Sequence, residues 1–355
     1  MKKGRKKILV AMIGIILVPV LLLFLFLFGM TIFSHKLPLY EVISVKNKSK
    51  QEFRNTNEFT ILTWNIGYGG LGKEMDFFYE GGKRVRPEKD EFKSYLSGIT
   101  RLLHNHDSAD FIFIQEIDLH SKRSYYQDES ADIANALKSH CSAVAENYDS
   151  WFVPLPLSEP MGRVVSGIAT FSKYNPVSAE RIGFGTEFSW PKQLFFLQRC
   201  FLVMRFMLAG GKELVLINTH NSTFDAEGEL RKKELATLRL FMLGEFWKGN
   251  YVLVGGDFNN NPLGFEKEDV HSGDLVKEIN PPIRSSFLPG WKFAFDPELP
   301  TNRDVDGPYR KGKTKTTIID FFVLSPNLEL VSAKTILTGF ACSDHQPVTI
   351  KVRFN

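Results

Sequence analysis

The stretch YVLVGGDFN, residues 251–259, decides the fold class of this chain. Its first residues are apolar and lead into two glycines, a pattern typical of a short buried strand that reaches a turn. Asp257 and Asn259 follow, two positions apart on that turn, so both side chains can face one ligand. The stretch therefore predicts a strand that delivers chemically useful side chains to the edge of a sheet.

The same arrangement recurs at the ends of other apolar stretches. A single case means little, because a buried strand normally leaves the core through a polar residue. Several cases in one chain are more informative, and they are Thr63-Trp64-Asn65, Gln115-Glu116, Asn218-Thr219-His220, Ile319-Asp320 and Ser343-Asp344-His345.

In their order and setting, these motifs resemble those of the endonuclease/exonuclease/phosphatase superfamily, the DNase I-like fold. The resemblance covers residues 59–355 and implies an α/β protein built as a four-layer α/β/β/α sandwich. It also implies divalent-metal-dependent hydrolysis of phosphate esters. The element pattern favours the same architecture, because strands outnumber helices and β-rich stretches lie between helices.

Hydrophobic periodicity predicts where these elements lie. The expected helices cover residues 91–105, 128–140 and 227–248. The expected strands cover residues 59–66, 109–117, 151–155, 164–171, 196–208, 213–219, 251–255, 317–324, 328–337 and 348–353.

The residue types at the strand ends suit phosphate-ester hydrolysis. A phosphodiester is anionic, so attack by water needs a cation on the non-bridging oxygens, an activated water and a protonated leaving group. Mg²⁺ prefers oxygen ligands and keeps several waters. Glu116, the amide oxygen of Asn65 and Asp344 fit such a sparse ligand set, and Mn²⁺ can take the same place.

The resemblance also implies a role for the remaining polar residues. Asp257 would orient or deprotonate the attacking water, and Asn259 would donate from its amide to the phosphate. His345 would bind the phosphate or shuttle a proton, while Asp320 holds the imidazole from behind. His220 would be the second catalytic histidine, the acid at the leaving group; the alternative is a capping or core histidine.

Two loops, 67–90 and 281–316, combine aromatic with basic residues. Such loops can insert at a lipid surface or stack on bases, and they can also be ordinary packed loops. Arg303 and Tyr309 of the second loop are candidate substrate-binding residues. Asn221 is a third candidate, because it stands where the family often has leucine.

The N-terminal region has a different character, because residues 8–33 contain no charged side chain. This run of 26 residues exceeds the roughly 20 that span a bilayer. We expect a basic tail over 1–7, a transmembrane anchor over 8–33, a polar linker over 34–58 and a catalytic domain over 59–355. A cleaved signal peptide is the alternative, but its apolar region usually has about 7–15 residues and ends in a small-x-small site.

Charge divides the chain in the same way. Of the 44 basic residues, five lie in residues 1–33 with no acidic residue, which leaves 39 basic against 40 acidic residues elsewhere. The positive-inside rule then predicts a single-pass protein of the cell membrane with a cytoplasmic N-terminus and an extracellular domain. The balanced remainder disfavours a sequence-independent nucleic-acid binder. The cysteines Cys141, Cys200 and Cys342 form no C-x-x-C motif, and their spacing does not say whether two of them pair.

The sequence thus predicts an extracellular, membrane-anchored, Mg²⁺-dependent phosphoesterase whose substrate is a lipid or a small phosphodiester. An extracellular nuclease acting on DNA or RNA is the alternative among enzymes. A catalytically silent binding module of the same fold is the alternative from another class. The intact set of Glu116, Asp257, Asn259 and His345 argues against it, because a dead enzyme need not keep them all.

Overall fold

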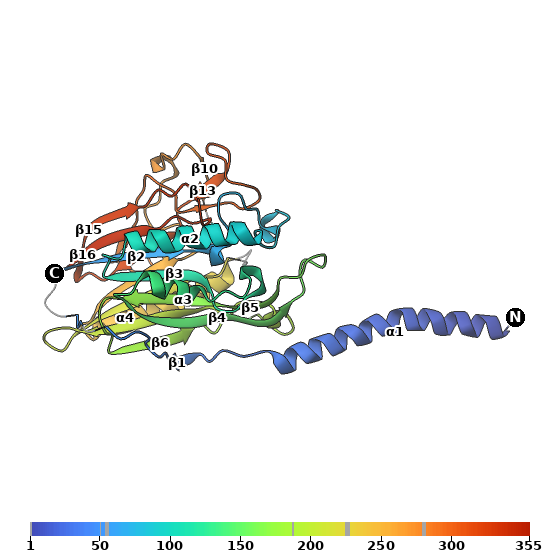
Figure 1. The fold of residues 1–355 in the computed structure, drawn as a ribbon. Helices are drawn as coiled ribbons and strands as arrows, with labels where there is room; N and C mark the ends of the chain where they lie inside the picture. Colours follow the sequence, from blue (N-terminus) through green and yellow to red (C-terminus); the bar gives the residue numbers. More distant parts are fainter. Residues whose placement is uncertain (1, 50, 54–56, 187, 224–227, 279–281) are drawn as a thin grey trace.

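A long N-terminal helix projects from a rounded domain (Figure 1). The computed structural model describes residues 2–49, 51–53, 57–186, 188–223, 228–278 and 282–355. The α-helices are α1 (Lys2–Phe33), α2 (Lys89–Asn105), α3 (Glu129–Ala136) and α4 (Glu229–Trp247).

Two large sheets make up the centre of the domain. The first has the strand order β15 (Leu328–Thr335), β16 (Val348–Phe354), β2 (Glu58–Asn65), β3 (Phe111–Asp118), β5 (Gly162–Ser172) and β4 (Cys141–Val153). The second has the order β1 (Tyr40–Val42), β6 (Ser178–Gly183), β7 (Cys200–Met207), β8 (Glu213–His220), β9 (Tyr251–Asp257), β14 (Asp320–Leu324) and β11 (Lys292–Ala294). A small sheet joins β10 (Leu275–Val276), β13 (Lys315–Thr317) and β12 (Asn302–Arg303).

The sheets pack face to face because their strands bury apolar side chains on both faces. In β3, Phe111 faces the core between the sheets, while Ile112 faces helices α2 and α3. Helix α4 covers the outer face of the second sheet with Leu238 and Met242, both fully buried. The arrangement is helix, sheet, sheet, helix, so the expected four-layer sandwich is confirmed. The apolar set between the sheets includes Phe59, Ile61, Phe113, Leu202, Met204, Leu216, Leu253 and Phe322.

Hydrophobic periodicity did not predict every strand correctly. Strand β4 begins at Cys141, well before the expected strand over 151–155, and β6 was not expected at all. Both strands intersperse polar residues among the apolar ones and so lack a continuous apolar run. The cysteines are free thiols; Cys141 and Cys200 are buried, and Cys342 is half-buried.

The segment 34–58, expected as a linker, packs on the domain in its described part. Strand β1 pairs antiparallel with β6, with Tyr40 opposite Ile182. Phe53 is buried in the core between the sheets, and its ring contacts those of Phe59 and Phe111. The segment expected as a linker is thus attached to the domain by strand pairing and by the buried Phe53, with Ile43 and Val45 packed against the same core.

Helix α1 is long and apolar enough to cross a membrane, a property that it shares with signal sequences. Its stretch Met12–Phe33 has a mean hydropathy of 2.9 and buries none of its most apolar window inside the protein. Among its described side chains, those of the last turns meet the domain, where Met30 is buried and the Phe26 ring lies against Phe152 and Phe195.

The packing of Phe53 predicts a stability effect that a free linker would not show. Phe53→Ala should lower the free energy of unfolding of the domain by about 3–5 kcal/mol, because it leaves a cavity between the sheets. Urea unfolding of the full chain in detergent micelles measures this. Val42→Ala is the matched control, since its side chain is 66% exposed on the edge strand. Equal stability of the two variants would contradict the packing.

Candidate active site

The strand registers bring the polar strand ends of both sheets to one place. Asn65 ends β2 and lies beside Gln115 of β3. In the other sheet, Asp257 at the end of β9 lies between His220 of β8 and Asp320 of β14. A cavity of about 430 Å³ opens there, and its polar lining includes Glu116, His220, Asp257, Asn259, Asp344 and His345.

A hydrogen bond between buried amides fixes one sheet against the other. Gln115 Nε2 of the first sheet donates to Asn218 Oδ1 of the second at 2.7 Å, and also to Thr63 Oγ1 at 3.1 Å. Asn218 Nδ2 donates back to the carbonyl oxygens of Ile114 at 3.2 Å and Ala169 at 2.8 Å. These motif residues are therefore structural, and they set how the strand ends that carry Glu116 and His220 face each other.

Two backbone irregularities complete the convergence. The ladder between β3 and β5 shifts register between Ile114 and Ile117, and Glu116 within this bulge has a φ of 52°. Such a bulge re-aims a side chain, and the Glu116 carboxylate remains 26% exposed at the cavity. Gly256 has a φ of 142°, and a Cβ there would lie 2.0 Å from the Thr219 carbonyl oxygen. Only glycine allows β8 and β9 to approach so closely beside His220 and Asp257.

Asn65 lies behind the cavity and orients two carboxylates. Its Nδ2 donates to Asp257 Oδ2 at 3.0 Å and to Glu116 Oε1 at 3.3 Å. Its Oδ1 accepts from the backbone N–H of Gly67 at 3.0 Å. The amide nitrogen therefore faces the acidic groups, whereas the sequence analysis expected the amide oxygen to serve as a metal ligand.

His345 is held from behind as expected. Its Nδ1 lies 2.8 Å from Asp320 Oδ2, and Trp64 Nε1 donates to its backbone carbonyl at 3.0 Å. Nε2 faces the cavity, 3.7 Å from Asp257 Oδ2 and 3.9 Å from Asp344 Oδ2. Burial alone would lower the pKa of His345, but three neighbouring carboxylates, with Asp320 the strongest, raise that pKa well above its usual range. These carboxylates therefore favour the charged form of the ring.

His220 has the opposite character. Its Nε2 lies 3.4 Å from Asp257 Oδ2 and 3.7 Å from Glu116 Oε1, but neither ring nitrogen makes a hydrogen bond to the described residues. Burial, together with the positive charge of Arg199, lowers the pKa of His220 well below its usual range. A neutral, buried imidazole with unsatisfied nitrogens suits hydrogen bonding to a bound group better than the acid role expected from the sequence.

Asp257 is the most central carboxylate of the site. Its Oδ1 accepts from the backbone N–H of Asn259 at 2.9 Å, and its Oδ2 accepts from Asn65. Burial, with a further contribution from Asp320, raises the pKa of Asp257 to about 7. The amide of Asn259 donates to the Asn221 carbonyl oxygen at 2.8 Å, which holds the turn in place.

The donor set fits a hard divalent cation. Glu116, Asp257 and Asp344 present carboxylate oxygens to one cavity, and burial together with Glu116 raises the pKa of Asp344. The ligand atoms of Asp257, Asp320 and His345 lie within 4.8 Å of one another. Oxygen-rich sites of this kind suit Mg²⁺ or Mn²⁺, since those ions prefer carboxylate ligands.

The three residues expected to contact substrate have partners within the protein, and none lines the cavity. Arg303 is buried and donates to the backbone carbonyls of the loop over residues 71–75, with Gly72 at 2.9 Å. Tyr309 donates its hydroxyl to Asp274 at 2.9 Å. Asn221 donates its amide to the buried Glu234 of α4 at 3.3 Å. Loop composition suggested these residues, but it carries no information on which way a side chain points.

Other cavity residues were missed by the sequence analysis. Asn302 places its Nδ2 3.0 Å from His345 Nε2. Arg199 lines the cavity just before β7, and among the described residues it forms no ion pair; its Nη1 lies 3.5 Å from the His220 carbonyl oxygen. The available signal was its position, since a basic residue that precedes an apolar strand reaches the same edge as the polar strand ends.

Comparisons with known proteins agree with the fold. The sequence model of the Endonuclease/Exonuclease/phosphatase family matches residues 62–345. An endonuclease/exonuclease/phosphatase from Bacteroides vulgatus is similar in structure, with a TM-score of 0.54, 14% identity and coverage of 84% of this chain and 100% of that one. ANGEL2, described as a 2',3'-cyclic phosphatase, gives 0.52 and 15% over 88% and 98%. D. rerio TDP2, solved with a single-strand DNA product, gives 0.51 and 13% over 84% and 100%. No curated protein sequence matches the chain.

The amide bridge predicts that the two sheets lose their alignment when it is removed. Asn218→Leu should lower stability by about 1–3 kcal/mol for each buried group that it leaves unpaired, and it should also lower turnover. Urea unfolding and hydrolysis of bis-nitrophenyl phosphate measure both effects. Unchanged stability in Asn218→Leu would show that the bridge is not needed.

Proposed function

The chain belongs to the endonuclease/exonuclease/phosphatase family, and on this premise we propose that it is a membrane-anchored, divalent-metal-dependent phosphoesterase. Its substrate is a lipid or a small phosphodiester. The observation that carries the proposal is the convergence of Glu116, His220, Asp257 and the Asp320–His345 pair on one cavity. The intact set also argues against a silent binding module.

The chain's own groups divide the work of hydrolysis. Asp257 orients the attacking water and accepts its proton, because a carboxylate that titrates near neutrality can do both. His345, kept cationic and oriented by Asp320, donates to the phosphate or to the departing oxygen. Neutral His220 donates a hydrogen bond to a phosphate oxygen, and the neighbouring Arg199 offsets negative charge.

A divalent cation would be held by Glu116 with Asp344, and Asn65 would keep the Glu116 carboxylate in place. When bound, it supplies positive charge to the phosphate oxygens and acidity to bound water. The need for such a cation follows from the cavity itself, because an anionic ester would otherwise meet several carboxylates. Mg²⁺ is the ion we propose, with Mn²⁺ as a substitute.

We assign helix α1 to the membrane and the domain to its outer side. Residues 1–7 form the basic cytoplasmic tail, and residues 8–33 form the span. Packing of Met30 and Phe26 on the domain favours an uncleaved anchor over a signal peptide, since these residues complete an apolar surface of the domain. The catalytic domain then includes the packed segment after the helix as well as residues 59–355.

A nuclease is the second candidate function. The TDP2 structure holds single-strand DNA, and ANGEL2 is described as a 2',3'-cyclic phosphatase, so this fold accommodates nucleic-acid chemistry elsewhere. The balanced charge of residues 34–355 disfavours this candidate. A panel of DNA, RNA, sphingomyelin, phosphatidylinositol phosphates and bis-nitrophenyl phosphate, each with Mg²⁺ and with EDTA, tests the two candidates against each other.

Metal dependence is the first expected outcome. Hydrolysis of bis-nitrophenyl phosphate should stop in EDTA and return with Mg²⁺ or Mn²⁺. Glu116→Gln should raise the cation concentration needed for half-maximal rate by at least about tenfold, because it removes a charged oxygen ligand. Glu213→Gln is the matched control, since Glu213 begins β8 at the end opposite His220. Full activity in EDTA would rule out this mechanism.

His345 and Asp320 should act as one unit. His345→Ala should lower turnover by about 10²–10⁴-fold, and Asp320→Asn by a smaller but still large factor, because it misorients the ring without removing it. The double variant should be little worse than His345→Ala alone. His106→Ala, at the end of α2, is the control. Fully additive losses would mean that Asp320 acts independently of the imidazole.

A further inference from the structure

We propose that the catalytic cavity opens onto the bilayer that holds α1, and that the substrate is a phospholipid drawn from that leaflet. This inference rests on the proposed function and names its substrate class. The contact surface is an interfacial rim of exposed apolar residues around the end of α1. We define the interfacial rim as Trp151, Leu155, Leu157 and Trp190, which are 52%, 46%, 83% and 55% exposed.

The strand registers place the rim and the cavity at the same end of the domain. Glu116 lies in the bulge of β3 that precedes the pairing of Asp118 with Ser166 of β5. Continuing along β5 towards its start leads to Gly162, which pairs with Val153 beside the rim hairpin. Figure 1 shows this β4–β5 hairpin projecting on the same side of the domain as α1. The site therefore faces the side from which the anchor leaves.

The rim lies at the depth of the membrane interface. Taking the apolar run to begin at Ile8, Phe26 is about 27 Å and Phe33 about 38 Å along the helix, against a hydrocarbon thickness of about 30 Å. The Phe33 ring stacks on Trp151 with centroids 5.4 Å apart, and Trp190 Nε1 donates to Thr31 Oγ1 at 3.1 Å. Two exposed tryptophans at this level match the aromatic belt of membrane proteins.

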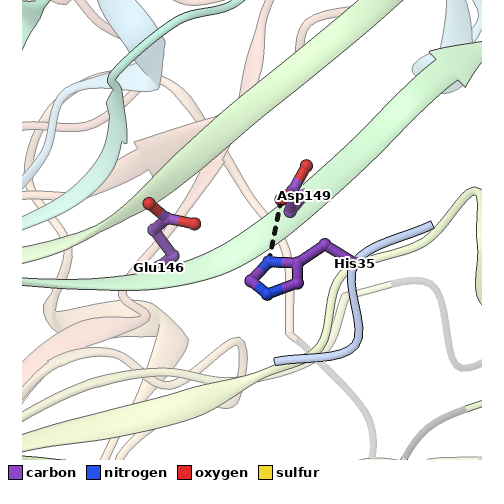
Figure 2. Close-up of side chains that lie close together, drawn as sticks. All are labelled: His35, Glu146 and Asp149. Atoms are coloured by element: carbon purple, nitrogen blue, oxygen red, sulfur yellow. Dashed lines mark hydrogen bonds and ion pairs between the residues drawn. The ribbon is translucent and has the colours of Figure 1, made fainter. Parts of the chain in front are cut away.

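The chain that leaves the membrane is clamped to the domain at several points. His35 Nδ1 lies 3.2 Å from Asp149 Oδ2 of β4, with Glu146 nearby (Figure 2). Gln198 makes two bonds, donating to the His35 carbonyl and accepting from the Leu37 N–H, both at 2.9 Å. The domain is therefore held in one orientation on its anchor.

One short segment, residues 195–199 with the sequence FFLQR, joins the anchor to the cavity. The Phe195 ring stacks on Phe26 of α1 with centroids 6.1 Å apart, and Phe195 also lines the cavity. Leu197 and Arg199 line the cavity as well, and Gln198 holds the juxtamembrane chain. An apolar path thus runs from the bilayer side to the catalytic groups.

The lining of the cavity suits an amphipathic ester. Charged and polar residues line it, among them the basic Arg123, Arg199, Arg231 and Lys277 and the residues His220, Asp257 and His345. Apolar or aromatic residues line it as well, and they include Phe77, Tyr79, Tyr148, Met161, Phe195 and Leu197. A phospholipid would place its phosphate against the charged groups and its apolar part against the apolar ones. The basic lining would receive the phosphate of any ester, so it is the exposed rim, which is apolar where a nucleic acid strand would need basic side chains, that favours the lipid.

The experiment uses the full chain reconstituted in vesicles of phosphatidylcholine, phosphatidylglycerol, phosphatidylinositol and sphingomyelin. Release of the phosphorylated headgroup is compared with hydrolysis of bis-nitrophenyl phosphate and of single-stranded DNA by the same vesicles. The test variant is Leu157→Ser/Trp190→Ser, which removes rim residues away from the catalytic groups. The control is Leu240→Ser, an equally exposed leucine on α4 at 68%.

The wild-type chain should hydrolyse the vesicle lipid, and the rim variant should lose about tenfold in that rate through weaker interfacial contact. Its rate on bis-nitrophenyl phosphate should stay within about twofold, as should both rates of Leu240→Ser. Hydrolysis of the soluble ester with intact vesicle lipid would overturn this inference alone. Faster cleavage of DNA than of lipid by the wild-type chain would overturn it too. So would a rim variant that loses equal factors in its rates on vesicle lipid and on bis-nitrophenyl phosphate. No hydrolysis of any ester would contradict the proposed function itself.

Discussion

A hydrogen bond between two buried amides, Gln115 and Asn218, sets the geometry on which the rest of the molecule depends. Each sheet would bury its apolar face in many alignments, because hydrophobic packing is not directional. A buried amide is hydrogen-bonded in far fewer of these alignments, and leaving it unpaired costs about 1–3 kcal/mol. The bridge joins residues next to Glu116 and two before His220, so the alignment that satisfies it also assembles the site. The same hydrogen bond therefore selects the alignment of the two sheets and the geometry of the candidate site.

Assembling the site has an electrostatic cost, because it brings carboxylates together away from water. Convergence places Glu116, Asp257 and Asp344 in one cavity, and burial, with a further contribution from Asp320, raises the pKa of Asp257. His345 relieves part of it by taking up positive charge between Asp320 and Asp257. A site left negative in this way favours a cation over an anionic ester. Binding of the proposed substrate therefore depends on the proposed metal, because the positive charge of the metal offsets the carboxylates that would otherwise repel an anionic ester.

The sequence anticipated the proposed catalytic groups better than their surroundings. Asn65, His220 and Asp257 end strands and Glu116 lies in a bulge near the end of β3, and strand order in a sandwich places such positions together whatever the loops do. Asn302 lies in a short strand of the small sheet, so only the three-dimensional path of the chain reveals it, whereas the position of Arg199 directly before β7 was a signal that the sequence offered. The sequence analysis did not foresee the partners of the three expected substrate-binding residues, because local geometry decides what a loop side chain contacts. Arg303 binds backbone carbonyls, Tyr309 binds Asp274 and Asn221 binds Glu234. Phe53 shows the same limit, since a polar stretch hid one buried ring.

Helix α1 and the cavity are connected by fixed contacts and not by a flexible linker. A flexible linker would only raise the local concentration of substrate, and it would leave the direction of the cavity free. Here the juxtamembrane chain is fixed through Gln198, and the neighbouring Leu197 and Arg199 belong to the cavity wall. Any tilt of α1 that displaces Phe26 must act on Phe195, which the two regions share. With α1 in the membrane as proposed, the segment that lines the cavity would also fix the orientation of the domain on the bilayer, and a substrate that approaches along the bilayer would meet the cavity directly.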